Sequence, residues 1–138
     1  MTKKVTKKGW VAKKNGYKSG LEDTVSQQIE SMGIKVEYET EKVNYIIPSS
    51  PHTYSPDFKL PNNIRVETKG RFVAADRKKH LLVKAQNPTL DIRFVFSNSK
   101  NKITKTSKTT YGDWCDKNGY KYADKIIPNE WFLEENRP

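Results

Sequence analysis

The stretch that most constrains how this chain can fold is residues 54–69, which read YSPDFKLPNNIRVETK. Two runs rich in β-forming residues, 57–60 and 64–69, flank the segment Pro61-Asn62-Asn63. Asparagine at such positions tolerates the backbone conformations of a tight turn. The stretch therefore predicts a β-hairpin.

The register of this hairpin brings two acids together. If Leu60 pairs with Ile64 across a three-residue loop, Asp57 lies opposite Glu67, with Cβ atoms roughly 5 Å apart. Side chains alternate along a strand, so Lys69 shares the face of Glu67. Facing carboxylates repel each other unless a cation lies between them, and hard oxygen ligands suit Mg²⁺ or Mn²⁺. We therefore predict a divalent metal site here.

A simpler interpretation of the hairpin stays open, because a solvated sheet face often carries Asp, Glu and Lys. Two neighbouring residues favour the metal site. Pro56 limits ladder pairing just before Asp57, as expected at a strand start or edge, and Gly70 after Lys69 lets a ligand come close. A Pro-Asp pair followed by Glu-x-Lys on the next strand is typical of metal-dependent phosphodiester cleavage.

The composition predicts one modest domain. The chain has 138 residues, of which 34% are hydrophobic, so one core can form. We expect a single domain over residues 19–138, preceded by a basic flexible tail over residues 1–18. No run approaches the length of a membrane span, and the lysine-rich start lacks the apolar core of a signal peptide. We expect a cytosolic protein with no membrane partner. Cys115, the single cysteine, is expected to be a packing residue.

The basic charge is concentrated at the start of the chain. The net charge is +10, and residues 1–18 contribute +7 with no acid, which leaves +3 for the other 120 residues. Such a tail can neutralise phosphates and release counterions, and Trp10 and Tyr17 can stack on exposed bases. A solvated tail without function is the alternative. The expected DNA contacts in the tail are Lys3, Lys4, Lys7, Lys8, Lys13 and Lys14.

A helix is predicted to begin at the capping box formed by Ser19 and Glu22. Gly33 supplies its end. Glu22 has two possible roles: it only caps the backbone, or it faces the hairpin as a third metal ligand. The expected buried stripe consists of Leu21, Val25, Ile29 and Met32.

The rest of the chain predicts alternating strands and helices. We expect strands at 34–39, 43–47, 91–97 and 120–127, helices at 74–86 and 110–117, and a helical turn at 128–133. Residues 49–53 and 98–109 are expected to be polar or basic loops. The inward residues of the second helix are expected to be Leu81, Leu82 and Ala85, and the core is expected to be closed by Trp114, Ile126, Ile127 and Trp131. Candidate DNA contacts, each with an ordinary solvated alternative, are His52, Arg77, Lys78, Lys102 and Lys105.

Several motifs together resemble one family. They are Ser19-Gly20-Leu21-Glu22-Asp23, His52-Thr53-Tyr54-Ser55-Pro56-Asp57-Phe58, Val66-Glu67-Thr68-Lys69-Gly70, Asp76-Arg77-Lys78-Lys79-His80-Leu81-Leu82, Tyr111-Gly112 and Ala123-Asp124-Lys125. Over about residues 18–131 the chain is similar to the phage Holliday-junction resolvases, which are restriction-endonuclease-like nucleases.

The resemblance implies an α/β fold with a mixed sheet flanked by helices and a domain-swapped homodimer in which residues 19–47 are exchanged. It also implies four catalytic residues, namely Glu22, Asp57, Glu67 and Lys69. We expect the three acids to hold one or two Mg²⁺ (or Mn²⁺) ions per site. Lys69 is then expected to orient the water or stabilise the transition state, and cleavage of branched DNA leaves 5′ phosphates. The alternatives are a nuclease of the same fold acting on linear duplex and a non-catalytic junction-binding protein.

Overall fold

A four-stranded sheet forms the centre of the molecule, as seen in a computed structural model that describes residues 16–47 and 50–135. The strand order is β3-β4-β5-β6. β3 is antiparallel to β4, whereas β4, β5 and β6 run parallel to one another. The strands are β3 (Phe58–Lys59), β4 (Ile64–Lys69), β5 (Asp91–Phe96) and β6 (Tyr122–Asp124). The expected mixed sheet with helices is confirmed.

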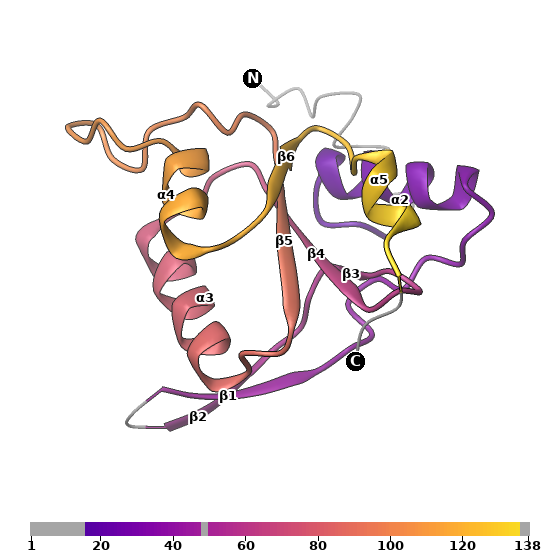
Figure 1. The fold of residues 1–138 in the computed structure, drawn as a ribbon, viewed down its shortest axis with the longest axis horizontal. Coiled ribbons are helices and arrows are strands. Elements are labelled where there is room, and N and C mark those ends of the chain that lie inside the picture. The colour runs from indigo at the N-terminus through magenta and orange to yellow at the C-terminus, as the bar shows by residue number, and fades with distance from the viewer. Residues whose placement is uncertain (1–15, 48–49, 136–138) are drawn as a thin grey trace, which may run out of the picture.

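Helices cover both faces of this sheet. Figure 1 shows α3 (Ala74–Gln86) and α4 (Tyr111–Asn118) on one side of β5, and α2 (Gly20–Ser31) and α5 (Asn129–Leu133) on the other. α3 connects β4 to β5 and α4 connects β5 to β6, as parallel neighbours require a crossover. None of the helices in the described part of the chain is long and apolar enough to cross a membrane.

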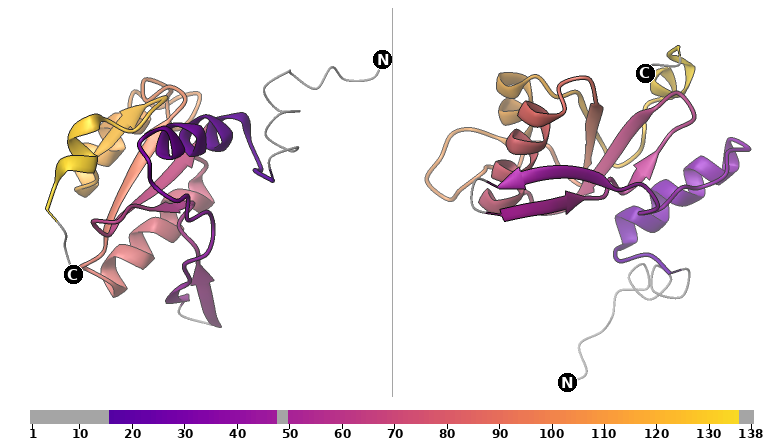
Figure 2. Two further views of the ribbon diagram at one scale, coloured as in Figure 1. Left: turned by 90° about the vertical axis from the view of Figure 1, so that its right-hand side faces the viewer. Right: turned by 90° about the horizontal axis from the view of Figure 1, so that it is seen from below.

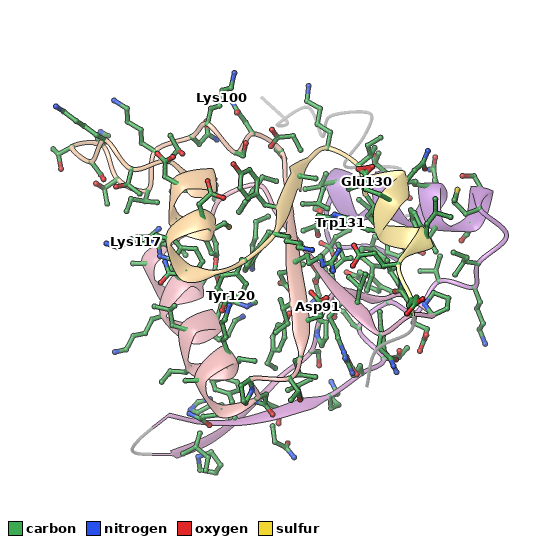
Figure 3. All side chains as sticks on the ribbon, in the orientation of Figure 1. Asp91, Lys100, Lys117, Tyr120, Glu130 and Trp131 are labelled. Carbon is green, nitrogen blue, oxygen red and sulfur yellow. The ribbon has the colours of Figure 1, made fainter. Side chains whose placement is uncertain are left out.

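The alternation of side chains along the strands divides the interior into two cores. Phe94 and Phe96 of β5 pack toward α3 and α4 in an aromatic core, whereas Val95 faces α2 and α5 in a mainly aliphatic one. Tyr120 and Trp131 lie in these two cores, on opposite sides of β5 (Figure 3). The period of two in strand geometry explains this division.

A two-stranded ribbon of β1 (Val43–Ile47) and β2 (Ser50–Tyr54) projects from the central sheet (Figure 2). The end of α3 is hydrogen-bonded to β1. The Gln86 side chain accepts from the N–H of Ile46 and donates to its C=O, and the Asn87 amide donates to the C=O of Asn44. The prediction of a polar loop after β1 was therefore wrong, since residues 50–54 form β2. Pairing with β1 satisfies the backbone of this segment despite its poor β propensity.

The segment 34–39 differs from the predicted strand. Within it only Tyr38 forms a bridge, to Phe58 of β3. Glu39 then takes a positive φ of 52°, which ends the pairing. Ile34, Val36 and Tyr38 still pack against the aliphatic core. These three residues therefore face the core, although the segment does not form the predicted strand.

The start and end of α2 are confirmed. The Ser19 side chain accepts a hydrogen bond of 3.1 Å from the backbone N–H of Glu22, and Gly33 has a φ of +74°. Val25 and Ile29 are buried, but Met32 is 45% exposed, because it lies beyond the last turn of the helix.

The bounds of α3 are confirmed, but its inward face is confirmed only in part. Leu82 packs against the aromatic core as predicted, whereas Leu81 and Ala85 are exposed. The fully buried residues of the helix are His80 and Val83. The final strand is shorter than predicted, and Ile126 is exposed, unlike Trp114, Ile127 and Trp131. Cys115 is fully buried, as expected of a packing residue.

Candidate active site

The hairpin has the predicted register. Phe58 pairs with Val66, and the N–H of Leu60 donates to the C=O of Ile64 at 2.8 Å. Asn63 supplies the turn with a φ of +68°. Continuing this register by one residue places Asp57 opposite Glu67.

Asp57 lies at the entry to β3 in a crowded acidic environment. Its Oδ2 accepts hydrogen bonds from the backbone N–H and the hydroxyl of Thr68, at 2.9 and 2.8 Å. Burial, followed by the charges of Glu67 and Glu22, raises the pKa of Asp57 to about 8. Burial and the neighbouring acids therefore disfavour the ionised form of Asp57, and a bound cation would oppose both effects.

Glu67 is buried on β4, with a different partner at each oxygen. Its Oε1 accepts a hydrogen bond of 2.6 Å from the hydroxyl of Tyr54, and its Oε2 lies 3.4 Å from Lys69 Nζ. Burial raises the pKa of Glu67, and the charge of Lys69 and the hydrogen bond from Tyr54 oppose that rise. These two partners favour the ionised carboxylate.

Lys69 lies between two acids. Its Nζ is 3.4 Å from Glu67 Oε2 and 3.6 Å from Oδ1 of Asp76, in the first turn of α3. Burial lowers the pKa of Lys69, but the charges of Glu67 and Asp76 outweigh burial, and the pKa is raised. Lys69 is therefore an ammonium ion at neutral pH, suited to stabilising negative charge rather than to acting as a base.

The first turn of α2 brings Glu22 to the hairpin within the same chain. Carboxylate oxygens of Glu22, Glu39 and Asp57 lie within 4.8 Å of one another. Glu22 also accepts a hydrogen bond from the hydroxyl of Tyr38, and Glu39 pairs with Lys18 at 3.0 Å. Of the three predicted metal ligands, Glu22 and Asp57 belong to this trio, while Glu67 acts on Asp57 from the neighbouring strand.

This donor set fits a hard divalent cation. Carboxylate oxygens of Glu22, Glu39 and Asp57 are close together, and burial with the charges of neighbouring acids raises the pKa of Asp57. Mg²⁺ and Mn²⁺ take oxygen ligands of this kind. The neighbouring ammonium of Lys69 completes a site that can stabilise charge on a phosphate.

Five of the candidate DNA contacts fall within the part of the chain that the structure describes. His52 is on β2, exposed, with its ring 5.9 Å from that of Tyr45. Arg77 is used within the fold, since its guanidinium donates to the C=O of Phe72. Lys78, Lys102 and Lys105 are exposed. The tail lysines up to Lys14 lie outside the described residues.

Sequence reasoning missed five side chains that the fold places around the four predicted ones. They contact or approach the predicted residues: Tyr38, Glu39, Tyr54, Thr68 and Asp76. Tyr54, Thr68 and Asp76 lie within the motifs quoted above. Membership of those motifs was the only local sign that they belong to the site. Glu39 and Tyr38 carried none, because they lie in residues 34–39, for which the sequence predicted only a strand.

Acids and a charged lysine at the antiparallel edge of a mixed sheet suit a nuclease, and two curated relatives carry the names of nucleases. The chain belongs to the phage endonuclease I family, whose sequence profile matches residues 1–138. It is 58% identical over 127 residues to "Endonuclease I" of Escherichia phage T7, covering 92% of this chain and 85% of the relative. It is 57% identical over 112 residues to "Endodeoxyribonuclease 1" of Enterobacteria phage T3, covering 81% and 74%. The protein is an endonuclease.

Proposed function

We propose that this endonuclease resolves four-way junctions and other branched DNA by metal-dependent hydrolysis that leaves 5′ phosphates. The observation that supports this best is the convergence of Glu22, Asp57, Glu67 and Lys69 at one edge of the sheet. The residues come from α2, the entry to β3, and β4. The family membership adds weight to the site assignment. We place the activity in the cytoplasm of the infected host cell.

The three acids have the role of holding one or two Mg²⁺ or Mn²⁺ ions. Asp57 and Glu67 would ligate directly, and Glu22 directly or through water, with Glu39 within reach of the same position. When bound, such an ion supplies the acidity that deprotonates water at neutral pH and neutralises charge on the phosphate and leaving oxygen.

Lys69 contributes charge stabilisation that the protein itself provides. Glu67 and Asp76 hold its ammonium on both sides, so it needs little reorganisation when negative charge develops on the phosphate. Because its pKa is raised, it orients the water or stabilises the transition state and does not remove a proton.

Selectivity for branches is proposed to come from a homodimer of restriction-endonuclease-like protomers. Residues 19–47 would be exchanged, so that the contact between Glu22 and Asp57 seen within one chain forms between partners instead. Two sites at a fixed separation can bind a bent junction through its backbones without reading sequence. The basic tail and the lysines at 98–109 would add phosphate contacts.

The test compares a four-way junction with a linear duplex of the same arm sequences. We expect the wild-type chain with Mg²⁺ to cut the junction at least about tenfold faster, and to cut neither DNA in a chelator. Glu67→Ala and Lys69→Ala should abolish cutting while junction binding stays within roughly tenfold, since one local contact is worth about 1 to 1.5 kcal/mol.

Two results would contradict this proposal. Equal cutting of junction and duplex would indicate a nuclease of linear DNA with the same site. Junction binding without any metal-dependent product would indicate a non-catalytic junction-binding protein. Cleavage retained by either variant would refute the site assignment.

A further inference from the structure

Tyr54 makes a contact with the acidic site that the proposed mechanism does not use. It is the last residue of β2, its side chain is buried, and its hydroxyl donates to Glu67 Oε1 at 2.6 Å. Lys69 lies near the other oxygen of the same carboxylate, at 3.4 Å. The two oxygens of Glu67 are therefore held by different groups on different elements.

The phenol ring of Tyr54 has little freedom to move. His80 packs edge-on against it with ring centroids 5.1 Å apart, and Lys79 Nζ lies 5.6 Å from the ring centroid. Both come from α3. The Tyr54 backbone pairs with Val43 of β1.

We propose that Tyr54 is a positioning residue, which holds one oxygen of Glu67 so that the carboxylate is already oriented for a divalent cation before the cation binds. This inference rests on the metal-dependent function proposed above. A carboxylate that is fixed beforehand loses little rotational freedom when it binds a metal ion. Mutation of a side chain that hydrogen-bonds a metal ligand commonly reduces metal affinity or activity 10- to 100-fold.

The test removes only the hydroxyl, with Tyr54→Phe, and measures Mn²⁺ binding to the full chain by calorimetry without DNA. We expect the affinity for Mn²⁺ to fall about 10- to 100-fold. Cleavage should then require correspondingly more Mn²⁺, while the rate at saturating Mn²⁺ recovers most of the wild-type value, because the variant keeps all the proposed ligands and Lys69.

Tyr120→Phe is the matched control. Tyr120 is also a buried tyrosine, and its hydroxyl donates at 2.7 Å to the backbone C=O of His80. His80 lies on α3, the helix that also packs against Tyr54. The hydrogen bond described for the Tyr120 hydroxyl goes to His80 and not to Glu67. We expect urea unfolding to show a comparable loss of stability in both variants, and Mn²⁺ affinity within about twofold of wild type in Tyr120→Phe.

Two results would overturn the positioning role while leaving the proposed function intact: wild-type Mn²⁺ binding by Tyr54→Phe, or an equal loss of binding in Tyr120→Phe. A wild-type chain that cuts DNA but neither binds nor requires Mn²⁺ or Mg²⁺ gives a different result. It would overturn the metal-dependent function itself, and the positioning role with it.

Discussion

His80 shows how single side chains near the site are constrained. Its side chain is fully buried, and within the described residues neither ring nitrogen has a hydrogen-bond partner. Tyr54, Phe72 and Phe94 surround the ring. Burial, with the charges of Lys79 and Lys69, lowers the pKa of His80 well below its ordinary value. The imidazole is therefore a neutral packing group and not a proton-transfer group.

The first prediction concerns the pH dependence of stability due to His80. Because its pKa is lower in the folded than in the unfolded state, the unfolded state binds the proton more readily below about pH 6.5. The contribution of His80 to stability is thus present above this pH and is lost as the pH falls. We expect the wild-type chain to lose stability relative to His80→Phe between pH 7.5 and 5.5, by at most about 1.4 kcal/mol per pH unit.

Urea unfolding in a chelator at several pH values measures this difference. Asp57 and Glu67 titrate in both proteins, so their effects cancel when wild type and variant are compared. A stability difference that does not change with pH would contradict the buried, neutral assignment of His80.

At the scale of elements, the site depends on how helix ends are anchored. α2 and α4 both begin with a side-chain cap, from Ser19 and Thr110, and in each the hydroxyl accepts a 3.1 Å hydrogen bond from the third helical N–H. In α2 that third residue is Glu22 itself. The cap on α2 therefore stabilises the helix and also positions Glu22, an acid of the proposed active site.

The second prediction compares the two caps. Ser19→Ala and Thr110→Ala should each reduce the free energy of unfolding by about 1 kcal/mol, since each loses one capping bond. Only Ser19→Ala should also reduce junction cleavage, by several-fold, because the first turn that carries Glu22 becomes less ordered. Chemical unfolding and single-turnover cleavage measure the two effects. Equal cleavage by the two variants would show that the cap does not position Glu22.

At the scale of the whole molecule, the proposed dimer can take Glu22 for each site either from the same chain or from the partner chain. The segment before β1 holds Glu22 and Glu39, and in the described chain both reach Asp57 of the same chain. The aliphatic core between α2, Phe58 and Val66 would be the same whether formed within one chain or between two. Domain swapping exchanges such contacts without changing their chemistry.

The third prediction distinguishes the two arrangements by complementation. Glu22→Ala and Glu67→Ala protomers are co-expressed, and heterodimers are purified through two tags. In a swapped heterodimer one site is intact and the other carries both substitutions, so it should nick a four-way junction on one strand without the paired incision. Without exchange every site carries one substitution, and the heterodimer should be inactive. Both homodimers serve as inactive controls. A pure heterodimer that does not nick would count against the swap.

Local sequence was sufficient for the elements that depend on neighbouring residues. The register of the central hairpin followed from Pro61-Asn62-Asn63, the start of α2 from Ser19, and the bounds of α3 from Asn87-Pro88 after its last turn. Turn chemistry, caps and helix breakers act over a few residues. For that reason Asp57 could be placed opposite Glu67 without tertiary information.

Only the tertiary structure decided what surrounds those acids. Tyr54 reaches Glu67, Asp76 reaches Lys69, and Glu39 comes beside Asp57. The first contact requires β2, most of which was predicted as a loop, to fold as a strand. The second depends on how α3 packs against the sheet, and the third on a positive φ at Glu39. Each results from packing between segments distant in sequence, and packing overrides local propensity.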